Sequence, residues 1–150
     1  MSLKQWAENG WLKPHKTTRQ EIGNLLKIVD RDLLDAAGGI SSDWRLGIAY
    51  NAALKLATIL LAAEGYRADR ASQHYRTIQS IPLILGEQYR SDADYLDTCR
   101  TKRNTIEYDS VGAATNEDSE ELSDFVKDFR VVVMDWLRTC HPELIKKTDQ

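Results

Sequence analysis

A stripe of apolar residues with helical spacing runs through the last third of the chain. Its members recur at intervals of three and four residues, at Leu122, Phe125, Val126, Phe129, Val132, Val133, Trp136 and Leu137. An α-helix repeats every 3.6 residues, so this spacing puts them all on one face. An acidic run at residues 116–121 precedes the stripe and suits the positive end of a helix dipole. The pattern predicts a long helix that packs on one side and ends at Pro142.

Two helices are predicted in the first half of the chain. Thr18 opens a capping-box pattern, and the apolar stripe behind it ends at Gly38 and Gly39. The next helix begins at a cap formed by Ser42 or Asp43 and continues to residue 65. It is apolar on most of its circumference. Such a helix is normally surrounded by others, so we expect it at the centre of a bundle.

Two further helices are predicted between these and the last one. The first covers about residues 69–85 and is closed by Gly86. Pro82 lies inside it and must kink or split it, because proline lacks the amide hydrogen that the helix needs. The second begins at Ser91 and extends through Ile106.

The remaining sequence gives no clear sign of a β-sheet. Strict alternation of apolar and polar residues is absent over more than a few positions, and no hairpin signal appears. The first 16 residues are expected to be a loose lead-in, in which Trp6, Trp11 and Leu12 lie against the bundle and Pro14 prevents a helix. We therefore predict one all-α domain over residues 1–150. It is an up-and-down bundle of four to five helices, with its core at about 17–140 and frayed ends.

Composition limits the classes of function. The longest apolar run is Ile59 to Ala63, and the N-terminus lacks the apolar stretch of a signal peptide, so we expect a cytoplasmic protein without a membrane span. The net charge of −3 means that nucleic-acid binding would need a local basic site. His15 and His141 lie near the chain ends and are given no role. Six side chains are predicted to fill the core: Trp44, Cys99, Phe125, Phe129, Trp136 and Cys140.

The segment from Cys99 to residue 109 carries the most unusual chemistry. Arg103 falls between Cys99 and Ile106 on the inward stripe of its helix. An arginine cannot lose its charge, so a partly buried one must be paired or must line a cavity. The polar side chains near it on the same helix are Arg100, Asn104, Glu107 and Tyr108. Two interpretations follow: an internal network in which Glu107 neutralises Arg103, or a site for an anion.

These residues also resemble a known family. Arg100, Lys102, Arg103 and Asn104, followed by Tyr108, look like the motif region of the HEPN superfamily of small bacterial helical proteins. Residues 63–67, His74 and residues 83–86 are also similar to one HEPN-like subfamily of uncharacterised proteins. The likeness covers about residues 20–138. It implies a bundle that forms a homodimer, with the motif helices of two subunits meeting at a shared cleft.

The resemblance further implies an activity. Active HEPN proteins are ribonucleases that need no metal, and their motif is an arginine, a polar residue, and a histidine a few positions beyond. Arg103 and Asn104 match the first two positions, whereas Glu107 and Tyr108 stand where the histidine is normally found. Such proteins act as toxins in defence or toxin–antitoxin systems. A nucleotidyltransferase antitoxin is the implied partner, with Tyr108 as a target for modification.

The sequence therefore predicts RNA or nucleotide binding at an arginine cleft. Arg103 would hold the phosphate, with Asn104 orienting it and with Arg100 and Lys102 adding positive charge. Tyr108 and Glu107 are the candidate proton-transfer groups. His74 would supply the titrating group instead if the third predicted helix faces the motif helix. No metal or cofactor motif is present, so none is expected. The alternative is a catalytically inactive module for dimerisation or partner binding.

Overall fold

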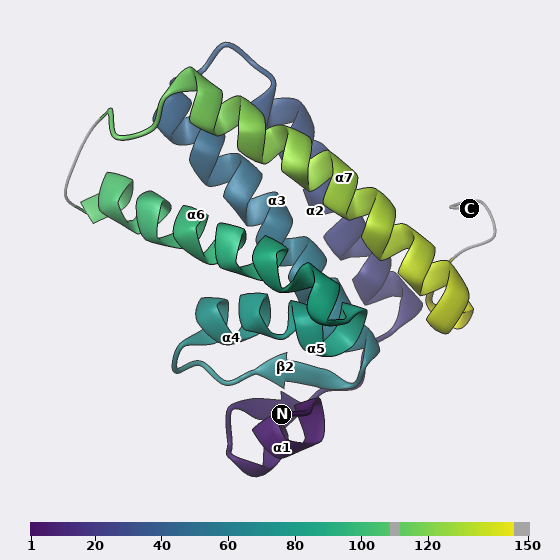
Figure 1. Ribbon diagram of the computed structural model, residues 1–150. Helices are drawn as coiled ribbons and strands as arrows, with labels where there is room; N and C mark the ends of the chain where they lie inside the picture. Colours follow the sequence, from purple (N-terminus) through teal and green to yellow (C-terminus); the bar gives the residue numbers. More distant parts are fainter. Residues whose placement is uncertain (109–111, 146–150) are drawn as a thin grey trace.

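The protein is a bundle of α-helices with a small two-stranded sheet at one end (Figure 1). The computed structural model describes residues 1–108 and 112–145, without the side chains of Glu107 and Tyr108. The elements in chain order are α1 (Leu3–Glu8), β1 (Leu12–Pro14), α2 (Arg19–Ala36), α3 (Ser42–Ala63), β2 (Tyr66–Ala68), α4 (Gln73–Gln79), α5 (Ile81–Leu85), a 3-10 turn (Glu87–Tyr89), α6 (Arg90–Tyr108), α7 (Asn116–Cys140) and a second 3-10 turn (Pro142–Leu144).

Helix α3 is the centre of the bundle, as its sequence predicts. It contacts α2, α6 and α7 as well as α4, α5 and β2. Its long apolar side chains, among them Leu56, Ile59 and Leu60, are fully buried. Among the helices of the described residues, α3 alone is long and apolar enough to cross a membrane, and 67% of its apolar stretch is buried inside the protein. The neighbouring elements therefore cover most of the apolar surface of α3.

The helix boundaries follow local capping chemistry. The Thr18 hydroxyl accepts a hydrogen bond from a backbone N–H in the first turn of α2, as predicted. Ser41, rather than Ser42 or Asp43, caps α3. Thr115 caps α7, where it forms a reciprocal capping box with Asp118. Each hydroxyl satisfies a donor that the helix itself leaves unpaired.

The segment predicted to be kinked by Pro82 is split into two short helices. Helix α4 ends at Gln79, and α5 begins at Ile81, directly before the proline. Pro82 then lies in the first turn of α5, where no amide hydrogen is required. Gly86 closes the segment with φ of 113°, a backbone conformation that favours glycine.

The expectation that the chain lacks a sheet and begins with a loose lead-in was wrong. Residues 3–8 form α1, and β1 pairs antiparallel with β2, with Leu12 opposite Ala68. Each strand has only three residues, too few for a readable alternation. Trp6 is buried in this small lobe, and the Arg76 guanidinium of α4 stacks 3.7 Å from the centre of the Trp11 ring. These contacts join the lobe to the bundle.

Four of the six predicted core side chains are buried or packed against the core. Phe129 and Cys99 are buried, while Phe125 and Trp136 are partly buried against the core. The prediction was wrong for the other two, because Trp44 is 70% exposed and Cys140 is exposed. Trp44 lies in the first turn of α3, before that helix is enclosed by its neighbours. Cys140 is the last residue of α7.

The two cysteines should differ sharply in reactivity. Burial raises the pKa of the Cys99 thiol to about 11, so it stays protonated near neutral pH, and the thiolate is the reactive form. Titration of the native protein with a coloured aromatic disulfide is expected to modify Cys140 only. Both thiols should react after unfolding in guanidinium chloride. Rapid modification of Cys99 in the native state would show that the packing of α6 is wrong.

Candidate functional site: a basic hollow between α4 and α6

Helix α4 lies alongside α6 (Figure 1). A solvent-open hollow of about 650 Å³ is lined by side chains of these two helices and of the segment before α4. We call it the basic hollow. Its lining residues are Arg70, Ser72, Gln73, His74, Tyr75, Arg100, Arg103 and Asn104. Three of them are arginines, and none is an acid. This set contains Arg100, Arg103, Asn104 and His74, which the sequence had singled out.

Arg103 lies on the inward side of α6, as the helical spacing predicts. Its side chain is half-buried, and its guanidinium carbon is 5.7 Å from the centre of the Tyr50 ring of α3. Burial raises the pKa of Tyr50 far above its ordinary value, although Arg100 and Arg103 act in the opposite direction. The Tyr50 hydroxyl therefore stays protonated, and the ring offers Arg103 a neutral surface. Whether Glu107 neutralises Arg103 lies outside the described residues, as does the placement of the Tyr108 side chain.

His74 reaches the basic hollow from α4, so the predicted condition for its use is met: its helix does face the motif helix. The ring is half-buried, and its Nδ1 lies 3.3 Å from the Tyr50 hydroxyl oxygen. This contact fixes one ring nitrogen toward the core. His74 and Arg103 therefore share Tyr50 as a common support.

Arg100 is the second α6 arginine of the hollow. Its Nε donates to Oδ1 of Asp97 at 2.8 Å, and its guanidinium carbon is 5.8 Å from the centre of the Tyr75 ring. The ion pair is partly exposed and contributes little to stability. It does hold the guanidinium in one direction while leaving other N–H groups of Arg100 for further hydrogen bonds.

Lys102 is not brought to the hollow with the other motif residues. Its Nζ lies 2.9 Å from Oδ2 of Asp118, at the start of α7. Asp118 also accepts the backbone N–H of Thr115, and this hydrogen bond, followed by Lys102, holds the pKa of the carboxyl below its ordinary value. Lys102 thus helps to join α6 to α7, which gives it a structural role.

The lowered pKa of Asp118 predicts a specific pH dependence. A carboxyl with a depressed pKa stabilises the fold above its unfolded pKa of about 3.9, and that contribution is lost as the pH falls through the folded value. Wild-type protein should therefore melt above the Asp118→Asn variant at pH 6, and the difference should shrink progressively as the pH falls below about 3.9. Asp124→Asn is the matched control, since Asp124 is exposed and its pair with Lys127 spans 3.9 Å. A difference that grows toward acid pH would contradict this assignment.

Four residues of the hollow were not expected from the sequence: Arg70, Ser72, Gln73 and Tyr75. Arg70 lies between β2 and α4, where no periodicity exists to place it. Ser72 has φ of 57°, and it is the single non-glycine residue in the described part of the chain with a positive φ. Strained backbone of this kind is often found at functional sites. The position of all four within four residues of His74 was the signal that the sequence offered.

A second hollow of about 640 Å³ adjoins the first and shares Arg103 with it. We call it the Trp44 groove. It lies between α2, α3 and α6, and its lining residues are Arg31, Asp32, Ser41, Asp43, Trp44, Gly47, Ile48, Asn51, Arg103 and Ile106. Arg103 thus borders two cavities on different sides of α6.

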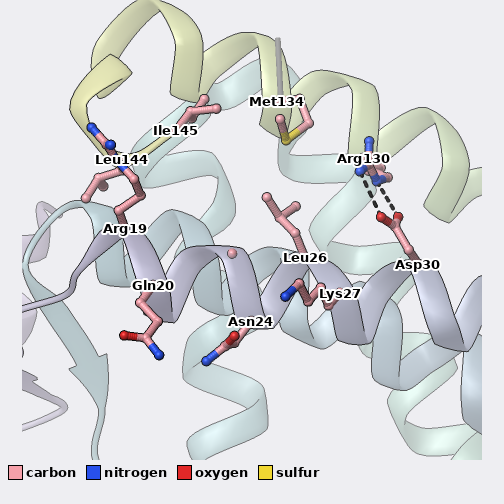
Figure 2. Close-up of a pocket in the computed structure, with 11 residues that line it drawn as sticks. Arg19, Gln20, Asn24, Leu26, Lys27, Asp30, Arg130, Met134, Leu144 and Ile145 are labelled. Carbon is pink, nitrogen blue, oxygen red and sulfur yellow. Dashed lines mark hydrogen bonds and ion pairs between the residues drawn. The ribbon is translucent and has the colours of Figure 1, made fainter. Parts of the chain in front are cut away.

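A third groove runs between α2 and α7 (Figure 2). Figure 2 shows Arg130 of α7 and Asp30 of α2 bridging it, with nitrogen–oxygen distances of 2.7 and 3.1 Å. At the other end the Nε of Arg19 donates to the backbone carbonyl of Glu143. Because the groove contains the acid that pairs with Arg130, it is a weaker candidate for an anion than the basic hollow.

Comparison with known proteins assigns neither a family nor a function to the chain. No protein-family model, curated protein or solved structure matches the chain. Within the described residues, no group of three or more histidine, cysteine, aspartate or glutamate side chains could hold a metal ion. The likeness to the HEPN superfamily therefore stays a prediction from the motif residues.

Proposed function

We propose that this protein binds RNA and that the basic hollow holds the phosphate groups of the RNA backbone. The observation that carries the proposal is the convergence of Arg70, Arg100 and Arg103 with His74 on one open cavity, and no acid is among the described side chains that line it. A guanidinium donates two parallel hydrogen bonds that match the oxygens of a phosphate. The net charge of −3 makes such a local cluster stand out from the rest of the surface.

The proposal includes cleavage of the bound strand without a metal ion. The 2′-hydroxyl oxygen of one nucleotide attacks its own 3′-phosphate, and the bond from phosphorus to the 5′-oxygen of the next nucleotide breaks. The products are a 2′,3′-cyclic phosphate and a free 5′-hydroxyl. His74 takes the proton from the 2′-hydroxyl and returns one to the leaving 5′-oxygen, and Arg103 stabilises the negative charge on the phosphoryl oxygens. Asn104 hydrogen-bonds the phosphate beside it.

A specific observation also supports the alternative of a non-catalytic interaction module. Leu34, Ile40 and Trp44 are exposed apolar side chains near the junction of α2 and α3. Exposed apolar clusters often mark a surface that binds another protein. A second copy of the chain is a partner that the resemblance implies for this version. The nucleotidyltransferase antitoxin that modifies Tyr108 belongs instead to the toxin-type ribonuclease.

Cleavage of a labelled single-stranded RNA in EDTA tests the enzymatic proposal. Wild-type protein is expected to produce ends with a 2′,3′-cyclic phosphate, and His74→Ala to cleave about 10²- to 10⁴-fold more slowly while still binding the RNA. The cleavage rates of Tyr108→Phe and Glu107→Gln show whether these residues, which stand where the motif histidine is normally found, transfer protons in its place. If the protein binds the RNA without cleaving it, the enzymatic proposal is wrong and the non-catalytic interaction module stands. Absence of both at low salt, where phosphate contacts are strongest, would overturn the proposed function.

A further inference from the structure

Trp44 is the most conspicuous side chain that the proposed function leaves unused. It is a large aromatic residue, 70% exposed, on the first turn of a helix in which every other residue is buried or partly buried. It lines the Trp44 groove together with Arg103, which also lines the basic hollow. An exposed indole and a guanidinium therefore border the same cavity.

The apolar side chains of the groove, with open space at Gly47 between them, fit a flat aromatic ring. Trp44, Gly47, Ile48 and Asn51 follow each other at helical spacing on one face of α3, and Ile106 of α6 adds a further apolar side chain. Gly47 leaves the centre open, because a Cβ placed there would have nothing within 4 Å. A volume of about 640 Å³ is within the range of small-ligand sites.

The two carboxylates of the groove are engaged within the protein. Asp32 is 4% exposed, and its oxygens accept from Arg31 at 2.9 Å and from Asn51 at 2.7 Å. Asp43 accepts the backbone N–H groups of Gly112 and Ala114. Both carboxylates thus already accept hydrogen bonds from groups of the protein.

Beside these hydrogen-bonded carboxylates, the groove presents one aromatic ring next to the guanidinium of Arg103. Proteins that bind single strands combine stacking aromatics with cations along the backbone in this way. A base stacked on Trp44 would be attached to a phosphate within reach of the arginine that belongs to both cavities.

We propose that the Trp44 groove binds an unpaired base of single-stranded RNA whose adjoining phosphate is held by Arg103. This inference rests on the proposed function and specifies its substrate class. A base inside a duplex is stacked on its neighbours and cannot lie on Trp44, so the site discriminates against duplex RNA. The strand then passes from the Trp44 groove over Arg103 into the basic hollow.

Fluorescence anisotropy with three labelled probes tests the proposal: a short single-stranded RNA, its duplex, and a strand of equal length with abasic linkers. Wild-type protein should bind the single strand about tenfold or more tightly than the abasic strand, because base stacking on one aromatic side chain is worth roughly 5- to 150-fold in affinity. Trp44→Ala should remove this preference and leave the affinity for the abasic strand unchanged.

Gly47→Leu provides a second variant that does not depend on deleting a side chain. A Cβ at this position meets nothing within 4 Å, and leucine favours a helix more than glycine does, so the variant is expected to fold and to fill the groove. Gly23→Leu is the matched control, since Gly23 is also within a helix, lines the groove of Figure 2, and has open space around its Cβ position. Gly47→Leu is expected to weaken binding of the single strand by about tenfold, and Gly23→Leu to leave it unchanged.

The outcomes separate this inference from the proposed function. If the single-stranded RNA binds and neither Trp44→Ala nor Gly47→Leu affects it, the groove is not a base site, while the basic hollow stays the phosphate site. If light scattering shows that Gly47→Leu changes the oligomeric state with unaltered RNA affinity, the groove is a contact between copies of the chain, and the inference is wrong. If wild-type protein binds no probe at low salt, the proposed function has failed.

Discussion

Replacing Arg103 by alanine is expected to weaken the binding of single-stranded RNA by about 10- to 100-fold. Each hydrogen bond from a charged group contributes about 1.5–3 kcal/mol, and Arg103 is the residue that borders both cavities. The loss of one phosphate contact should also reduce the slope of log affinity against log salt by about 0.7. Titrations at several salt concentrations measure both quantities.

The control for this variant is Arg130→Ala. Arg130 is also a half-buried arginine, but it forms an ion pair with Asp30 in the groove of Figure 2, away from the proposed site. RNA affinity should be unchanged in this variant. Arg103→Lys keeps the charge but loses the planar donors, so it should bind with intermediate affinity. If Arg103→Ala and Arg130→Ala weaken binding equally, the interaction is non-specific attraction, and the basic hollow is not the site.

Leu60→Ala should produce the largest loss of stability. Leu60 is completely buried in α3, at the centre of the bundle, and truncation there leaves a cavity among the surrounding helices. Such substitutions reduce the free energy of unfolding by about 2–5 kcal/mol. Urea denaturation followed by far-ultraviolet circular dichroism measures this loss.

The same substitution at an exposed leucine provides the comparison. Leu34 is 77% exposed on α2, so Leu34→Ala should change the free energy of unfolding by less than about 0.5 kcal/mol. The two variants remove the same atoms and differ in burial. Equal losses would contradict the assignment of α3 as the core helix.

Most of the fold could be predicted because the long helices carry clear local signals. The stripe from Leu122 to Leu137 and the cap at Thr18 are patterns within a single element, and the structure confirms the helices that they predict. Helix α2 ends at Ala36, two residues before the glycines at which its end was predicted. The paired strands β1 and β2 were missed because three residues are too short for a pattern. Burial at helix ends was also missed, as Trp44 shows, since it depends on where neighbouring helices stop.

The candidate site could be predicted only where one helix contained it. The spacing within α6 placed Arg103 inward and Arg100 nearby, and both line the basic hollow. Lys102 shares the same motif but turns toward Asp118, because its direction is set by the packing of α7. Arg70 and Tyr50 reach the site from other elements, so no spacing along the chain could associate them with it.

Nuclear magnetic resonance of the arginine side chains tests the central claim most directly. A short single-stranded RNA would be titrated at low salt into protein labelled with ¹⁵N, and the Nε–Hε resonances of the arginines would be followed. We expect Arg70, Arg100 and Arg103 to shift first and at the same RNA concentration, with Arg19 and Arg130 unaffected. Shifts confined to Arg19 and Arg130, or no shift in any arginine, would contradict the assignment of the basic hollow as a phosphate site.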